Sequence, residues 1–150
     1  MKLKTHLAIG IFAMLLFLPI VNSQILFSVM VIVGSLLPDI DTPFSSVGKY
    51  KLAKVTQVLT RHRGALHSLT FCFLGSLALA VFVPVLAFGF FLGYSLHLIT
   101  DSFTKMGVSP FWPYKKSARG VLVTGGMSEK VIFIVFVIID FVLAGVMLFR

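Results

Sequence analysis

The hydrophobic residues of this chain are gathered into long apolar blocks with short polar segments between them. Four blocks stand out, at about residues 5–21, 25–37, 65–99 and 131–149. A helix that crosses a membrane needs roughly 20 mostly apolar residues, within a range of about 17–25. The pattern therefore predicts an all-α membrane protein. No internal repeat is visible, and we expect residues 1–150 to form a single integral membrane domain.

The third block is too long for one spanning helix, and Pro84 lies near its middle. A proline inside a helix kinks it or ends it, so the block is either one tilted helix or a helical hairpin. If it forms two spans, 12 of the 13 Lys and Arg residues fall on one side of the membrane, with only Arg150 on the other. Because basic residues accumulate in cytoplasmic loops, we predict two spans that meet at Pro84.

This gives five transmembrane helices, with the N-terminus cytoplasmic and the C-terminus outside. The polar segment 47–60 adds a further element, because Leu52, Val55 and Leu59 share one helical face while basic residues occupy the others. Such a pattern is typical of an amphipathic helix on the membrane surface, and the alternative is a solvated basic loop. The predicted fold class is a polytopic bundle of about five transmembrane helices and one amphipathic interfacial helix.

Composition supports a membrane protein, since 58% of the residues are hydrophobic and only 12% are charged, against about 25% charged in ordinary soluble domains. The formal net charge is +8. No basic soluble domain exists to bind nucleic acid, whereas basic flanks of membrane spans attract anionic lipid headgroups. We therefore expect membrane lipids as partners, and no nucleic acid. The single cysteine, Cys72, is expected to be a small buried apolar residue.

The first 24 residues allow a second interpretation. Two lysines, an apolar core and the small residues before Gln24 are typical of a signal peptide cleaved near Ser23. Cleavage would remove His6 from the mature chain.

Seven ionisable side chains are placed by the predicted topology at the cytoplasmic ends of four spans. They are His6, Asp39, Asp41, His62, His67, His97 and Asp101. The topology was derived from Lys and Arg alone, so this convergence is an independent observation. Ionisable groups at membrane depth are costly and usually functional, and together the seven predict a metal or proton site. Taken singly, each has a plainer interpretation as an interfacial His or a capping Asp.

The spacings favour a shared site. His97 and Asp101 are four residues apart and share one face of a helix. Asp39 and Asp41 are two apart and would diverge on a helix, but the flanking prolines favour a non-helical segment that can turn both inward.

The donor set indicates a divalent metal. Crowded carboxylates repel one another unless a cation lies among them, and His with Asp but without Cys suits Zn²⁺, Mn²⁺ or Fe²⁺. Seven ligands exceed the four of a tetrahedral zinc ion. They would suit two ions about 3.5–4 Å apart, as in many phosphoesterases. We therefore predict two divalent ions, with zinc as the first choice.

Two acidic residues lie outside this layer. Asp140 is near the middle of the last span, where it either pairs with a hydroxyl in the bundle or marks an ion path. Glu129 is at the start of that span, and we interpret it as a charge that stabilises the helix N-terminus, with a role as metal ligand as the alternative.

Four motifs carry a family resemblance: THLAIG at 5–10, LLPDIDTP at 36–43, HRGALHS at 62–68 and HLITDSFTKMGVSPFWPY at 97–114. In this order they resemble the membrane-bound metal-dependent hydrolase family, whose members include LexA-binding inner-membrane hydrolases. The resemblance implies a helical bundle similar to zinc-dependent phospholipase C and P1-type nucleases, with the same seven ligands. It also implies that the first span, with His6, is retained. The second His-x-x-x-Glu pair of the soluble relatives has no counterpart here, so no third metal is implied.

These inferences predict a phosphoesterase of the cytoplasmic (inner) membrane that uses a metal-activated water. Asp39 and Arg63 are the catalytic candidates. Arg63 would hold phosphate oxygens through its guanidinium, although it is equally well explained as a basic flank of a span. Trp112 and Tyr114 would anchor their loop at the headgroups or contact a lipid chain. The membrane location indicates a lipid phosphate as substrate.

Two other functional classes remain open. An ion or metal transporter would use the same ligands for its cargo, but five spans would need an oligomer, and polar residues within the spans are few. A regulatory membrane protein would bind a partner through the basic loops, and its function would survive Asp39→Ala.

Overall fold

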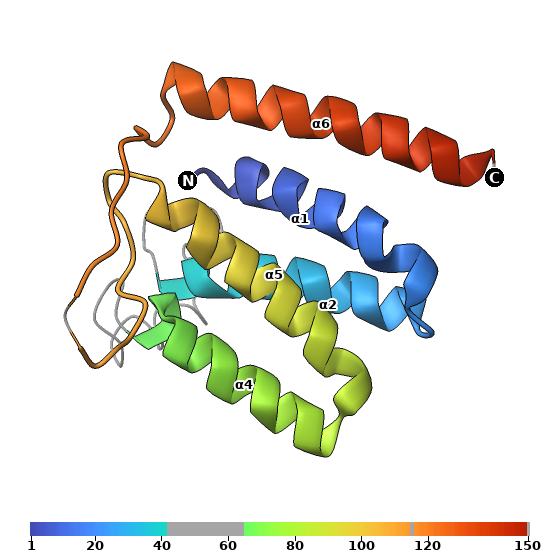
Figure 1. Ribbon diagram of the computed structural model, residues 1–150, viewed down its shortest axis with the longest axis horizontal. Coiled ribbons are helices and arrows are strands. Elements are labelled where there is room, and N and C mark those ends of the chain that lie inside the picture. The colour runs from blue at the N-terminus through green and yellow to red at the C-terminus, as the bar shows by residue number, and fades with distance from the viewer. Residues whose placement is uncertain (42–64, 115, 150) are drawn as a thin grey trace.

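A computed structural model describes residues 1–41, 65–114 and 116–149 of the chain, without the side chains of Ile40 and Asp41. Five long helices run back and forth between the two ends of the molecule (Figure 1). They are α1 (Leu3–Phe17), α2 (Gln24–Leu36), α4 (Leu69–Phe82), α5 (Pro84–Ser102) and α6 (Met127–Leu148). Three short 3-10 helices accompany them: η1 (Leu18–Ile20), η2 (Leu37–Asp41) and η3 (Ala65–His67). The described residues contain no strand, only two isolated β-bridges within 103–126. The predicted all-helical fold is confirmed.

Three segments are long and apolar enough to cross a membrane, namely Leu3–Ile20, Pro84–Ser102 and Met127–Leu148. The apolar segments Gln24–Asp39 and Leu69–Phe82 are shorter. Each predicted span thus corresponds to an apolar helix, but membrane crossing by the two shorter ones stays a prediction. The predicted amphipathic helix at 47–60 lies outside the described residues.

The third apolar block is a helical hairpin, as predicted. Helix α4 ends at Phe82, Val83 has non-helical backbone angles, and α5 begins at Pro84. Proline suits this first helical position because its fixed φ is already helical and its missing N–H is not needed there. The start of α4 is capped by Ser68, whose Oγ accepts a hydrogen bond from the N–H of Phe71 at 3.1 Å.

Helix α5 lies at the centre of the bundle and packs against α1, α2 and α4, whereas α6 lies at the edge and packs mainly against α1 among the described helices (Figure 1). The α2–α5 contact is close because glycines line it. A Cβ on Gly93 would collide with the carbonyl oxygen of Val31, and a Cβ on Gly34 would meet the carbonyl oxygen of Phe90. Small residues allow the close backbone approach on which helix packing in membranes depends.

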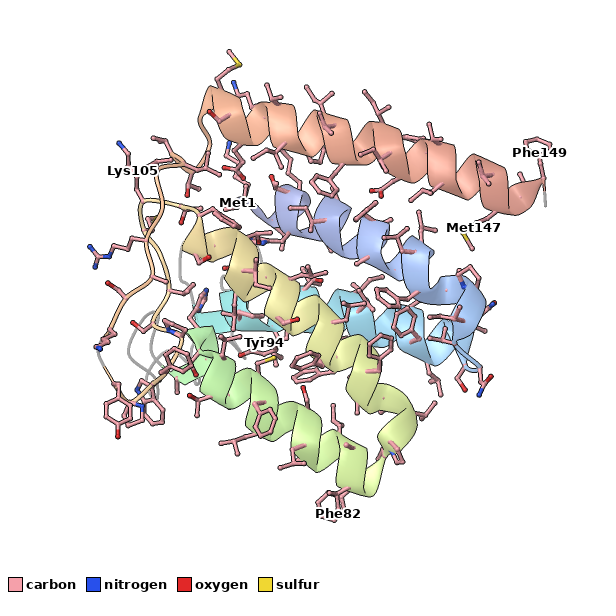
Figure 2. All side chains as sticks on the ribbon, viewed as in Figure 1. Met1, Phe82, Tyr94, Lys105, Met147 and Phe149 are labelled. Atoms are coloured by element: carbon pink, nitrogen blue, oxygen red, sulfur yellow. The ribbon has the colours of Figure 1, made fainter. Side chains whose placement is uncertain are left out.

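Large apolar side chains cover the outside of the bundle (Figure 2). Phe82 is 82% exposed at the tip of the α4–α5 hairpin, and Phe141 on α6 is 76% exposed. Exposure of so much apolar surface to water would be unfavourable, whereas its contact with lipid tails is not. The outward faces of the helices are therefore suited to lipid.

Polar groups gather at one end of the bundle, where α1 and α6 begin and α5 ends (Figure 2). The described basic residues at this end are Lys2, Lys4, Lys105, Lys116, Arg119 and Lys130. The segment 103–126 also lies there, with Trp112 47% and Tyr114 75% exposed. This is the one-sided distribution on which the predicted topology rests. The orientation of that end toward the cytoplasm, and the headgroup contacts of the two aromatic residues, stay predictions.

Candidate metal centre

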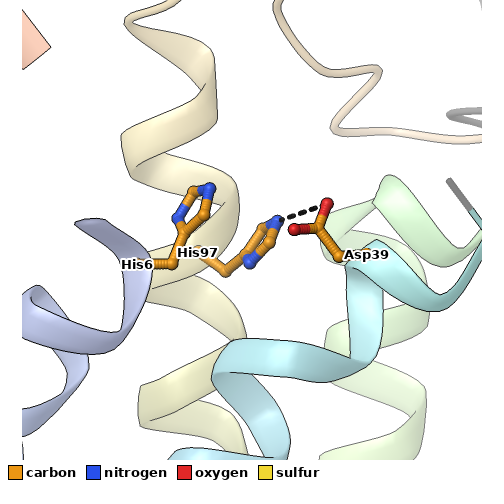
Figure 3. A group of neighbouring side chains, drawn as sticks. All are labelled: His6, Asp39 and His97. Carbon is orange, nitrogen blue, oxygen red and sulfur yellow. Dashed lines mark ion pairs between the residues drawn. The ribbon is translucent and has the colours of Figure 1, made fainter. Parts of the chain in front are cut away.

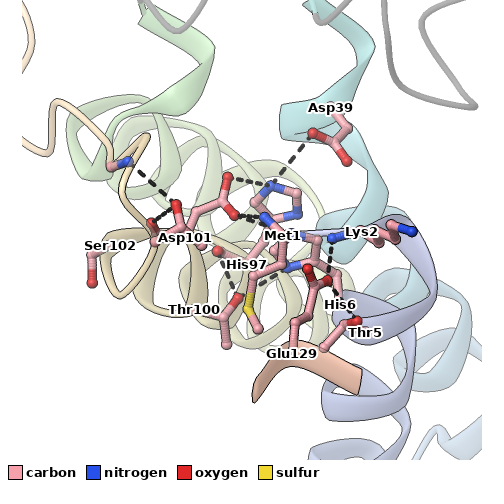
Figure 4. Close-up of polar contacts among 12 residues, drawn as sticks. Met1, Lys2, Thr5, His6, Asp39, His97, Thr100, Asp101, Ser102 and Glu129 are labelled. Atoms are coloured by element: carbon pink, nitrogen blue, oxygen red, sulfur yellow. Dashed lines mark hydrogen bonds and ion pairs between the residues drawn. The ribbon is translucent and has the colours of Figure 1, made fainter. Parts of the chain in front are cut away.

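Five of the predicted ligands meet at the polar end of the bundle. His6 comes from α1, Asp39 from η2, His67 from η3, and His97 and Asp101 from the last turns of α5. All five are buried, with exposed fractions between 0% and 7%. Four separate segments of the chain therefore contribute to one polar cluster inside an otherwise apolar bundle (Figures 3 and 4).

Asp101 is the hub of this cluster. Its Oδ1 lies 3.3 Å from Nε2 of His6, and its Oδ2 lies 3.9 Å from Nε2 of both His67 and His97. The N-terminal ammonium of Met1 also contacts Oδ1 (Figure 4). The contact between His97 and Asp101 confirms that their spacing of four places them on one face of the helix.

Asp39 faces the cluster from the opposite side. Its Oδ1 lies 3.9 Å from Nε2 of His67 and 3.9 Å from Nε2 of His97 (Figure 3). Helix α2 ends at Leu36, and the chain tightens into η2. The segment after Pro38 is therefore a 3-10 helix and not the irregular stretch that we expected.

The imidazole of His97 is oriented by a backbone carbonyl. Its Nδ1 lies 2.7 Å from the carbonyl oxygen of Ser35 on α2. Because a carbonyl can only accept, Nδ1 carries the hydrogen, and in the neutral ring the lone pair is on Nε2. This Nε2 points toward Asp39, and it is buried without a hydrogen-bond partner among the described residues.

The imidazole of His6 is oriented in the same sense by Thr100. The Thr100 hydroxyl donates to the carbonyl oxygen of His97 at 2.9 Å, so it accepts from Nδ1–H of His6, also at 2.9 Å. Nε2 of His6 therefore carries a lone pair, and it too is buried without a hydrogen-bond partner in the described part of the chain. The two rings are stacked, with centroids 3.8 Å apart and planes 11° apart.

These features fit a divalent cation. Metal-binding histidines usually donate their second ring N–H to a carbonyl or a similar group, which fixes the tautomer. Two triads offer ligand atoms within 4.8 Å of one another: His6, Asp39 and His97; and His67, His97 and Asp101. Ligands of a tetrahedral zinc ion, each about 2.0–2.1 Å from the metal, lie roughly 3.4 Å apart, so both triads could close on an ion with small shifts. His97 offers one lone pair and can serve only one triad at a time.

Three of the predicted site residues cannot be placed. Residues 42–64, with His62 and Arg63, lie outside the described part of the chain, and Asp41 is described only by its backbone at the end of η2. Of the remaining polar residues, Asp140 lies on α6, away from the cluster. Among the described residues its Oδ1 has no hydrogen-bond partner, so the expected hydroxyl is not found there.

Glu129 joins the beginnings of α1 and α6 beside the cluster (Figure 4). One carboxylate oxygen accepts from the N–H of Lys2 at 2.5 Å and from the hydroxyl of Thr5 at 2.9 Å, and the other accepts from the N–H of Gly125. Glu129 thus lies in the first turn of α6, the position predicted for a helix N-terminal charge, and the same side chain also accepts hydrogen bonds at the beginning of α1. Thr5 precedes His6, so Glu129 fixes the segment that presents this imidazole.

Comparison with known proteins places the chain in a family. Residues 1–149 match the family described as YdjM inner membrane protein. The chain is 39% identical over 92 residues to "Inner membrane protein YdjM" of Escherichia coli (strain K12), which covers 55% of this chain and 46% of that protein. It is 31% identical over 106 residues to "Uncharacterized protein YvsG" of Bacillus subtilis (strain 168), covering 67% of this chain and 66% of that protein.

The chain spans about half the length of the YdjM relative that it matches, and about two thirds of the YvsG relative. No solved structure matches it significantly. The inner-membrane relatives agree with the apolar helices and with the expected membrane location. On the match over nearly its whole length, the chain belongs to the YdjM inner membrane protein family.

Proposed function

We propose that this chain is a membrane-embedded, metal-dependent hydrolase that cleaves a phosphate ester at the cytoplasmic membrane surface. The observation that carries the proposal is the paired orientation of His6 and His97. Each ring donates through Nδ1 and presents the lone pair of Nε2 to a buried cluster that also contains two carboxylates. Such an arrangement is expensive in an apolar bundle unless a cation completes it.

A divalent ion held by these residues would supply Lewis-acid activation of a water molecule and of a phosphoryl oxygen. The protein groups would have separate tasks. His97 would hold the ion together with either His6 and Asp39 or His67 and Asp101, with Ser35 and Thr100 fixing two of the imidazoles. Asp39 is the most exposed of the five, at 7%, and as a carboxylate it can accept the proton of the attacking water.

Two further features belong to the proposal. Arg63, outside the described residues, is the candidate for holding phosphate oxygens. Asp41 and His62 are the candidates that would complete a second metal position, since His97 cannot serve both triads. The resemblance of the sequence motifs to metal-dependent hydrolases favours phosphate ester hydrolysis, and the exposed Trp112 and Tyr114 favour a lipid phosphate.

The test is a hydrolysis assay on the purified full chain in detergent, supplied with Zn²⁺ or Mn²⁺. The substrates are bis-p-nitrophenyl phosphate and mixed micelles of phosphatidic acid or phosphatidylglycerol. We expect turnover of at least one substrate that a chelator abolishes, that His97→Ala lowers to background, and that the neighbouring change Ser102→Ala leaves intact. Metal-loaded protein that hydrolyses none of these substrates, or equal turnover by His97→Ala, would contradict the proposal.

A further inference from the structure

A second site lies on the other side of α1, between α1 and α6. A cavity of about 440 Å³ is lined by Lys4, Leu7, Ala8, Ile11, Leu15, Phe133, Val137, Asp140, Phe141 and Ala144. His6 lies on roughly the opposite face of α1, at about 100° per residue, and contacts α5 instead. The cavity is therefore separate from the metal cluster, and its size is within the range of about 300–1,000 Å³ typical of small-molecule sites.

The cavity exists because small residues face it from both helices. Ala8 on α1 and Ala144 on α6 leave room between the backbones. The edge-to-face pair of Phe12 and Phe136, with ring centroids 5.2 Å apart, holds the two helices together. The cavity is therefore a feature of how α1 and α6 pack against each other.

Asp140 makes this cavity unusual. It is the only acidic side chain in the lining, and its Oδ1 is buried without a hydrogen-bond partner among the described residues. Its Cα is about 20 Å along the helix from the beginning of α6, at about 1.5 Å per residue. A carboxyl group at such depth is costly unless a partner is supplied. A plain acyl chain has no hydrogen-bond donor to supply.

We propose that the α1–α6 cavity binds an amphipathic amine, whose alkyl body fills the apolar groove and whose ammonium pairs with Asp140. Charge complementarity favours an ammonium over a neutral tail, and aromatic residues of the lining favour a cation as well. At one end of the cavity a cation already lies over an aromatic ring, because Nζ of Lys4 lies 4.4 Å from the ring centroid of Phe133. The volume suits a single-chain amphiphile, whereas a partner helix with a diameter of about 10–12 Å is too large for it.

The experiment is photolabelling of the full chain in nanodiscs with a dodecylamine that carries a diazirine in its alkyl chain. Labelled peptides are mapped, and unlabelled dodecylamine or dodecanol is added as competitor. We expect label on residues 7–15 and 137–144, competed by the amine at least tenfold better than by the alcohol. Asp140→Asn, which keeps the shape and removes the charge, and Ala144→Phe, which fills the groove, should each lower labelling at least tenfold. Val146→Phe, on the same helix outside the lining, should not.

Equal labelling of Asp140→Asn, equal competition by dodecanol, or label spread over the outer faces of the helices would overturn the proposal. If Ala144→Phe fails to fold, Asp140→Asn decides. Bound metal is measured on the same samples and should be unchanged in Asp140→Asn. The amine site and the metal site can therefore fail independently.

Discussion

The contact between α2 and α5 and the contact between α1 and α6 differ in kind. At the first, glycines bring two backbones so close that Gly93 leaves no room for a Cβ beside Val31. At the second, two helices flank an open cavity of about 440 Å³ and meet through an aromatic pair and the hydrogen bonds of Glu129. The close contact fixes the distance from His97 to Ser35, and the open contact leaves space for a ligand. The close α2–α5 contact thus supports the metal cluster, and the open α1–α6 contact provides the proposed amine site.

The largest effect is expected from breaking the close contact. Gly93→Leu would force α2 and α5 apart, because its side chain has no space beside the backbone of Val31. We expect the free energy of unfolding to fall by at least about 3 kcal/mol, at the upper end of the cost of overpacking, with loss of bound metal. Denaturant titration in detergent micelles measures this free energy of unfolding.

Gly145→Ala, where a Cβ meets nothing within 4 Å, is the matched control, and its free energy of unfolding should stay within about 1 kcal/mol of wild type. Wild-type stability of Gly93→Leu would show that the glycine contact is unimportant.

A smaller loss is expected when an orienting group of the metal cluster is removed. Thr100→Val keeps the size of the side chain but takes away the acceptor for Nδ1–H of His6. Metal affinity should fall by about 10–100-fold, the usual cost of losing such a partner, with little change in stability. Competitive titration with a chromophoric chelator measures the affinity, with Ser102→Ala as control. Unchanged affinity in Thr100→Val would remove His6 from the ligand set.

A still smaller effect is expected when the hydrogen bonds of Glu129, which join α6 to α1, are weakened. Glu129→Gln replaces one carboxylate oxygen by an amide NH₂ that cannot accept from both helix beginnings. We expect a loss of about 1–2 kcal/mol in stability, and faster hydrogen exchange confined to the first turns of α1 and α6. The exposed neighbour Lys130→Gln should behave as wild type. Uniform loss of protection across α2 and α5 would show that α6 is no looser than the rest.

The smallest effect concerns the aromatic pair at the open contact. A double-mutant cycle of Phe12→Leu and Phe136→Leu should give a coupling energy of about 0.5–1.5 kcal/mol, because the rings meet edge to face at 5.2 Å. Coupling near zero would mean that the cap at Glu129 alone holds α6 in place.

Much of the framework could be predicted from the sequence because it depends on local signals. The apolar blocks predict the five helices, Pro84 together with the one-sided distribution of Lys and Arg predicts the hairpin, and the spacing of His97 and Asp101 predicts their common face. The clustering of Lys and Arg predicted that chemically active residues from distant segments would share one end, and the five described ligands do meet there.

The missing parts depend on tertiary contacts. Nothing in the sequence around Ser35 predicts that its backbone carbonyl orients His97. Thr100 likewise has no predictive feature except its position between two predicted ligands. The cavity beside Asp140 arises from the packing of α1 against α6, two helices far apart in the chain, which no local pattern encodes. The 3-10 geometry of η2 replaced the expected irregular segment because proline at its second position is compatible with continued helical turns.

The central claim is that the cluster of His6, Asp39, His67, His97 and Asp101 holds a metal ion. The most direct measurement is the metal content of the full chain, purified without chelator and counted by elemental mass spectrometry beside the Asp39→Ala/His97→Ala double variant. We predict at least one transition metal ion per chain in the wild type, two if Asp41 and His62 complete a second position, and none in the double variant. No metal in a folded, metal-supplied wild type, or equal content in the double variant, would contradict the account.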